Sequence, residues 1–113
     1  MDWFSAKVRM ACLIEGVGLV RYMDSIHVFQ AENFDAAMQR ALVLGRGHEE
    51  EYVNSSQEHV RWRLKEIVSL DILRQGLSDG IEIYSEPAEP GLTEFFDYDA
   101  KFNPDTSTPT QTI

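Results

Sequence analysis

The chain is small and acidic, because its 113 residues carry 19 Asp and Glu against 10 Lys and Arg, for a formal net charge of −9. This length allows one domain with a single core. The pI of about 4.6 argues against electrostatic binding of nucleic acid or of anionic lipid, and it favours a basic partner.

The compartment can be predicted from the cysteine count and from the apolar stretches. Cys12 is the single cysteine, so no disulfide can form within the chain, which suits a reducing cytosol. The first residues lack the basic and apolar regions of a secretory signal. The longest apolar stretch, residues 10–14, is far shorter than the roughly 18 residues that a membrane helix needs. We therefore expect a cytoplasmic protein.

The first thirty residues predict a β-hairpin. Apolar residues recur at period two along the first segment, at Phe4, Ala6, Val8, Met10, Cys12 and Ile14. This period is typical of a strand with one buried face. Two glycines within residues 15–18 supply a turn, and a second strand follows over residues 19–30. Because Asp24 shares the register of Tyr22 and Ile26, we expect a bulge near residues 23–25.

A helix follows the hairpin. Asn33 is a good N-cap, and apolar residues recur after it at helical spacing: Phe34, Ala37, Met38, Ala41, Leu42 and Leu44. Two ends are compatible with the sequence, between Leu44 and Tyr52. Gly45 can cap the helix, or the helix can continue past Gly47 at an entropic cost of about 1 kcal/mol per glycine.

Two more strands are predicted after a loop at residues 54–57. Residues 59–70 alternate with Val60, Trp62 and Leu64 facing inward, and the alternation changes phase at Glu66, which indicates a bulge. A turn at Ser78-Asp79-Gly80 then leads into a short strand over residues 81–85.

These elements predict an α+β fold, in which an antiparallel sheet of about four strands carries one long helix on one face, in the order ββαββ. A ferredoxin-like variant would need a second helix, which the segment around Gln75-Gly76 does not favour. Residues 1–86 form this single domain. Residues 87–113 hold all four prolines and read as an acidic, mostly disordered tail.

No catalytic motif is recognisable in the chain. It has no phosphate loop, no G-x-S-x-G, no H-E-x-x-H and no paired CxxC. His48, Glu51 and His59 lack the spacing of a metal site, so we expect neither a metal nor another cofactor. His27 lies within a strand, as expected of a partly buried, hydrogen-bonded histidine.

Basic residues gather on one predicted face of the sheet. If Val60, Trp62 and Leu64 face the helix, the residues between them project from the opposite, helix-free face. The same alternation adds residues of the first two strands, so that this face carries Lys7, Arg9, Arg21, Arg61, Arg63 and Lys65. Glu82 is the only obvious acid among them, and close like charges destabilise a sheet.

Three explanations of the basic face stay open. The cations can lie well apart, cover apolar area with their stems and pair with Glu82. The acidic, aromatic part of the tail can fold back across the face, in the same chain or on a second subunit, through Phe95, Phe96 and Tyr98. Alternatively, the face binds an anionic ligand or an acidic segment of another protein. The residues of such a site are Lys7, Arg9, Arg61, Arg63 and Lys65.

Several short motifs resemble one known family. The opening Trp3-Phe4-Ser5-Ala6-Lys7 is similar to the W-[FY]-S-A-K start of a small bacterial domain-of-unknown-function family, DUF number 4288. Similar motifs stand at residues 52–54, 60–62 and 79–85, so the resemblance spans about residues 3–85 and leaves the tail uncovered. It implies a compact bacterial domain with no established activity. The matching positions, to which it assigns no role, are Ser5, Lys7, Tyr52, Asn54, Trp62, Asp79, Glu82 and Tyr84.

Charge and size together predict a non-enzymatic protein-interaction module, such as an immunity protein or an inhibitor, whose acidic surface meets a basic protein. The alternative is a module that binds a small anionic ligand or a nucleotide on the basic face. A hydrolytic enzyme ranks last, because no nucleophile and base can be named. A homodimer through the open sheet face is compatible with each of these functions.

Overall fold

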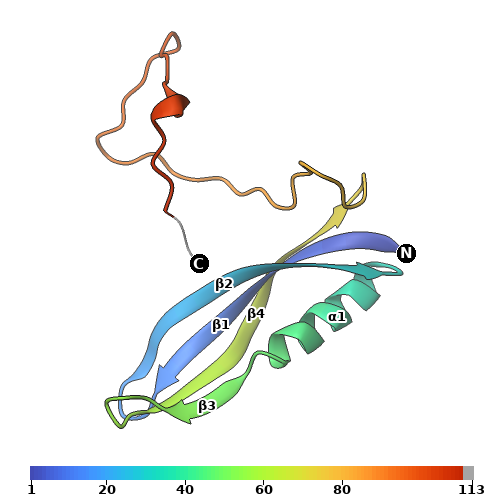
Figure 1. Cartoon of the computed structure of the whole chain (residues 1–113), viewed down its shortest axis with the longest axis vertical. Helices are drawn as coiled ribbons and strands as arrows, with labels where there is room; N and C mark the ends of the chain where they lie inside the picture. The colour runs from blue at the N-terminus through green and yellow to red at the C-terminus, as the bar shows by residue number, and fades with distance from the viewer. Residues whose placement is uncertain (111–113) are drawn as a thin grey trace.

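The computed structural model describes residues 1–110. Its elements follow the order ββαββ: β1 (Asp2–Ile14), β2 (Gly18–Ala31), α1 (Phe34–Arg46), β3 (Glu50–Val53) and β4 (His59–Leu73). The strands form one curled antiparallel sheet in the order β2-β1-β4-β3 (Figure 1). The predicted α+β fold is therefore confirmed.

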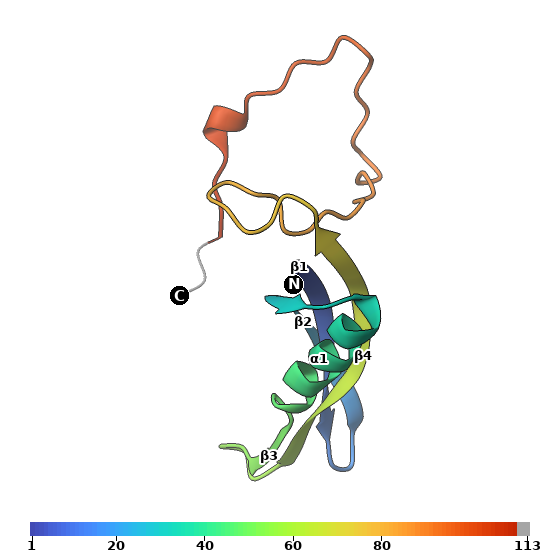
Figure 2. The same cartoon turned by 90° about the vertical axis from the view of Figure 1, so that its right-hand side faces the viewer.

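The helix lies against one face of the sheet and leaves the other face without a helix (Figure 2). A helix of 13 residues is about 20 Å long, whereas a strand of 13 residues spans about 43 Å. The helix therefore covers only part of the sheet. The buried core lies beneath it and consists of Phe4, Ala6, Val8, Met10, Phe29, Ala31, Ala37 and Ala41.

The two predicted bulges have opposite outcomes. β2 pairs with β1 without a break over residues 21–31, so the bulge predicted near residues 23–25 is wrong. That prediction rests on a core position for Tyr22, which instead lies on the helix-free face beside Asp24. The bulge predicted near Glu66 is confirmed, because the register of β4 against β1 shifts on either side of this residue.

The helix ends at Arg46, with Gly47 as its C-cap. Both ends that the sequence left open are wrong, because Gly45 lies inside the helix and the helix does not extend to Tyr52. A Cβ on Gly45 would come within 2.7 Å of the Leu64 Cδ1 atom. Glycine at this position therefore allows the helix to lie close to β4.

Of the two strands predicted after the helix, the strand at residues 59–70 is confirmed as β4 and the strand at residues 81–85 is wrong. β3 occupies residues 50–53 and pairs with the first part of β4, which itself extends to Leu73. Residues 81–85 form no strand. The sequence did not predict β3, because the run Glu49-Glu50-Glu51 contains poor strand formers and is typical of a solvated loop.

Beyond β4, the described residues form no further strand and only one short 3-10 helix, Pro104–Thr106. Figures 1 and 2 show that this part of the chain runs on past one end of the sheet. The domain boundary at residue 86 stays a prediction. Among residues 1–110, no helix is long and apolar enough to cross a membrane.

Candidate functional site

The helix-free face of the sheet gathers four of the predicted basic residues together with carboxylates that the sequence did not indicate. Each of Lys7, Arg9, Arg61 and Arg63 forms at least one ion pair. The carboxylates that they meet are Asp24, Glu51, Glu66 and Glu86. The expectation that Glu82 is the only acid near these cations is therefore wrong, and the face is balanced rather than basic.

The centre of this face is a bidentate pair between neighbouring strands. Arg9 Nε donates to Asp24 Oδ1 at 2.8 Å, and Arg9 Nη2 donates to Asp24 Oδ2 at 2.9 Å. Glu66 lies 3.6 Å from the same guanidinium, and the Tyr22 ring centroid is 5.1 Å from it. The hydrogen bonds from Arg9 lower the pKa of Asp24. Arg9 is therefore occupied on several sides by groups of its own chain.

Lys7 lies under the segment that follows β4, residues 74–86, which we call the strap. Lys7 Nζ donates to Glu86 Oε2 at 2.6 Å and lies 5.1 Å from the Tyr84 ring centroid. The Tyr84 hydroxyl donates to the same Glu86 oxygen at 3.2 Å. The hydrogen bond from Lys7 lowers the pKa of Glu86. As a result, the side chain of Lys7 is only 14% exposed.

Two buried hydroxyl groups flank Lys7. Ser5 lies two residues before it on the same strand and face, and Ser69 lies directly opposite it on β4. Neither hydroxyl has a hydrogen-bond partner among the described residues, although Ser5 is only 1% exposed. An ammonium and two hydroxyls on one face are the donors that an oxyanion needs. Glu86 supplies such an oxyanion to Lys7, but it accepts a hydrogen bond from neither serine.

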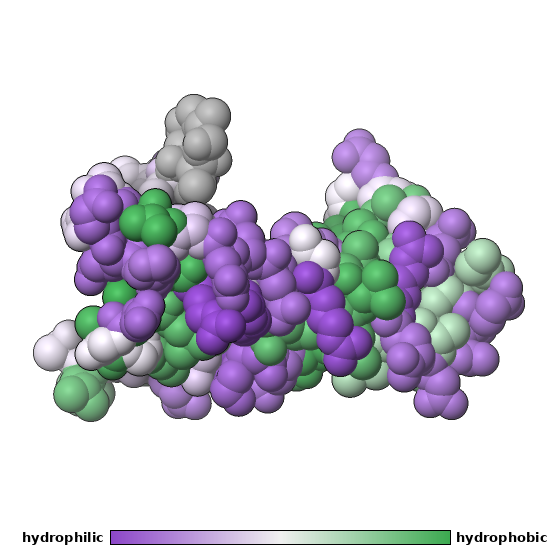
Figure 3. All heavy atoms as spheres, turned by 90° about the horizontal axis from the view of Figure 1, so that it is seen from below, coloured by the Kyte–Doolittle hydropathy of each residue, from purple (hydrophilic) through white to green (hydrophobic). Residues whose placement is uncertain are grey.

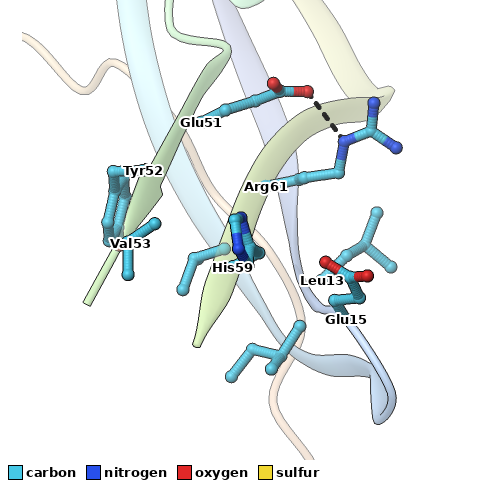
Figure 4. A pocket seen from close by; sticks show the side chains of 9 residues that line it. Leu13, Glu15, Glu51, Tyr52, Val53, His59 and Arg61 are labelled. Atoms are coloured by element: carbon cyan, nitrogen blue, oxygen red, sulfur yellow. Dashed lines mark hydrogen bonds and ion pairs between the residues drawn. The ribbon is translucent and has the colours of Figure 1, made fainter. Parts of the chain in front are cut away.

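The far end of the sheet holds a second group of charges, beside an open depression of about 770 Å³ (Figure 4). Glu51 of β3 and Arg61 of β4 point toward each other there, and Arg61 Nε donates to Glu51 Oε1 at 2.8 Å. Arg63 donates to the same oxygen. Hydrogen bonds from both guanidiniums lower the pKa of Glu51. The depression therefore offers paired charges, and it is also lined by Glu15 and His59, whose side chains make no hydrogen bond or ion pair within residues 1–110.

Two other predicted cations do not join these groups. Lys65 is exposed at the irregular part of β4 and makes no ion pair within residues 1–110. Arg21 lies opposite Cys12, on the side of the sheet that carries the helix, so its predicted place on the helix-free face is wrong. The sequence prediction placed Tyr22 on the helix side of β2, whereas in the structure Tyr22 faces away from the helix and Arg21 faces toward it.

The aromatic residues predicted to contact the sheet are exposed. Phe95 and Phe96 are 86% and 65% exposed, and Tyr98 is fully exposed. The Phe96 ring packs against another tail residue, Phe102, at 4.9 Å between ring centroids. The part of the chain that returns to the helix-free face is instead the strap.

One histidine pair was not anticipated. The rings of His27 and His48 are 5.2 Å apart, and Ser25 Oγ lies 3.1 Å from His27 Nε2. Burial and the nearby His48 lower the pKa of His27. Within residues 1–110 no three potential metal ligands cluster, and no carboxylate is hydrogen-bonded to His27. The arrangement therefore lacks the third group of a catalytic triad.

A family model described as a domain of unknown function (DUF4288) matches residues 3–85. The chain belongs to this family. No curated protein and no solved structure matches the chain. The DUF4288 match covers the helix, the sheet except Asp2, and all of the strap except Glu86.

Some of the motif residues that carry the resemblance have structural roles here. Trp62 Nε1 donates to the Tyr52 hydroxyl at 3.1 Å, which joins β4 to β3. Asn54 Oδ1 accepts the backbone N–H groups of Ser56 and Glu58 at 2.9 and 3.0 Å, so this side chain shapes the loop between the strands. Lys7 and Tyr84, by contrast, meet on the helix-free face, where Ser5 lies two residues before Lys7 on the same strand.

Proposed function

We propose that this DUF4288 protein is a non-enzymatic protein-interaction module whose acidic, aromatic segment, residues 91–102, binds a basic protein. The observation that carries the proposal is the exposure of large apolar side chains among carboxylates in this segment. Leu92, Phe95, Phe96, Tyr98 and Phe102 are at least 65% exposed. Exposed aromatic clusters of this kind are typical of partner-binding surfaces.

The charge distribution supports a basic partner. The four cations of the helix-free face are already neutralised by carboxylates of the same chain. The formal net charge of −9 therefore resides on groups outside that face, including Glu94, Asp97 and Asp99 of the segment. A basic protein is attracted to such a surface at long range, and its association is weakened by salt.

The test compares the native chain with a Phe95→Ala/Phe96→Ala/Tyr98→Ala variant in pull-downs from the native cell. The matched control is Val43→Ala, which removes an equally exposed apolar side chain from the helix. We expect one stoichiometric basic protein with the native chain and with the control, and none with the triple variant. The captured protein is then purified and titrated against salt. Equal capture by all three chains, or binding that salt does not weaken, would reject the proposal.

A second function, binding of a small oxyanion, is favoured by the unpartnered hydroxyls of Ser5 and Ser69 beside Lys7. In this proposal the Glu86 carboxylate occupies the site, and a phosphate or a free carboxylate competes with it. Inorganic phosphate should raise the melting temperature of a Glu86→Gln variant more than that of the native chain, and a Lys7→Met variant should not respond. The absence of a shift in Glu86→Gln would remove this candidate.

A further inference from the structure

The two edges of the sheet are protected to very different degrees. β3 ends one edge with four residues, of which two are Glu50 and Glu51. Short, charged edge strands resist pairing with other strands. β2 ends the opposite edge with 14 residues, and among residues 1–110 it pairs only with β1. This second edge presents a long row of backbone donors and acceptors.

β2 has few of the features by which proteins usually protect an edge strand, apart from one irregularity of register near Val20 and the charged residues Arg21 and Asp24. It contains neither Pro nor Lys, and its pairing with β1 has no bulge over residues 21–31. Six of its large apolar side chains are exposed, and they come from both faces of the sheet: Leu19, Val20, Tyr22, Met23, Ile26 and Val28. Apolar side chains also lie open between polar ones in the view of Figure 3. From residue 21 to residue 31 this edge is regular and largely apolar, and such an edge is a template for another strand.

The charge of β2 indicates which strand fits. A chain with a net charge of −9 repels its own copies over most of its surface. The charged side chains of β2 are Arg21 and Asp24, so the formal charges of this strand sum to zero. Asp24 forms an ion pair with Arg9 of β1. A second copy therefore meets the least repulsion at this edge, whereas a basic protein is attracted to the acidic parts elsewhere.

We propose that two copies of this chain associate by antiparallel pairing of their β2 strands around a two-fold axis. A two-fold contact needs one self-complementary surface on each copy, and an antiparallel strand edge is self-complementary in its hydrogen bonds. The four-stranded sheets then join into one continuous sheet, with both helices on the same side. Exposed side chains such as Ile26 and Val28 gain neighbours across the new strand pair.

Analytical ultracentrifugation of the full chain, from low to high micromolar concentration, tests the association. We expect a concentration-dependent species of twice the chain mass of 12.9 kDa. In parallel, hydrogen exchange of the β2 amides that point away from β1 should slow as the concentration rises. A chain that stays monomeric throughout, with these amides exchanging at unprotected rates, would overturn the proposal.

Lysine substitutions locate the interface. Ile26→Lys and Val28→Lys place a charge on the β2 edge, and the matched control Val43→Lys places it on an exposed position of the helix. We expect both β2 variants to weaken the dimer about tenfold or more and the control to leave it unchanged. Far-UV circular dichroism confirms folding. A dimer that persists in the folded β2 variants contradicts the proposal, and if those variants do not fold, the exchange data on the native chain decide.

Discussion

Replacing Ser5 by Ala should stabilise the protein, although the side chain lies in the most buried part of the sheet. The Ser5 hydroxyl is buried and has no hydrogen-bond partner among the described residues. An unsatisfied buried hydroxyl costs about 1–3 kcal/mol, and alanine removes that cost while leaving only a small void. We therefore expect the free energy of unfolding to rise by about 1 kcal/mol, which corresponds to roughly 4–8 °C in melting temperature for a domain of this size.

Urea unfolding followed by tryptophan fluorescence measures this effect, with thermal unfolding as a second readout. Ser25→Ala is the matched control, because Ser25 is exposed and its hydroxyl contacts His27 at 3.1 Å. We expect the control to change stability by less than about 0.5 kcal/mol. A destabilisation of Ser5→Ala by about 1 kcal/mol or more would refute the reasoning, because it would mean that the hydroxyl is satisfied in solution.

Four further predictions follow from the core, the helix cap and two titrating groups. Phe4→Ala should cost about 3–5 kcal/mol in urea unfolding, because this ring is fully buried between Phe29 and the helix. Asn33→Ala should cost about 1 kcal/mol by the same assay, since the Asn33 side chain accepts the backbone N–H of Ala36, in the first turn of the helix, at 2.8 Å. Arg9 lowers the pKa of Asp24, so the fold should lose stability as the pH falls below the ordinary carboxyl value of 3.8; stability measured against pH should decline less in Arg9→Gln. Because the pKa of His27 is also lowered, the stability of the fold should decrease as the pH falls below 6.5. His27→Gln should make stability less dependent on pH in that range.

The parts of the fold that follow from local periodicity could be predicted from the sequence. The period-two pattern of β1, the Asn33 cap and the apolar stripe of the helix each depend on residues close together in the chain. The segment at residues 81–85 shows the limit of this argument. Its alternating isoleucines favour an extended backbone, but this local pattern does not tell whether that backbone pairs with a neighbouring strand.

The charge pairs of the candidate site could not be predicted, because they depend on strand order and register. From the sequence, Asp24 is an unfavourable charge in a strand expected to be buried. The pairing of β2 with β1 puts Asp24 opposite Arg9, which explains the charge. From the sequence, Glu51 is part of a solvated acidic run. The pairing of β3 with β4 puts Glu51 opposite Arg61. The sequence placed four of the six cations correctly on one face, but it misplaced Arg21 and contained no local signal for the carboxylates that neutralise the four.

Salt should separate the two associations proposed for this protein. The β2 edge has no net charge, so dimerisation there rests on backbone hydrogen bonds and apolar burial, which moderate salt does not weaken. Binding of a basic protein to residues 91–102 depends on exposed carboxylates, and raising the ionic strength from about 0.1 M to 1 M shortens the screening length from about 10 Å to 3 Å. A salt titration of the mixed sample should therefore release the basic protein while leaving the dimer intact. If salt instead dissociates the dimer and leaves the basic protein bound, the charges of β2 and of the tail have been assigned to the wrong interfaces.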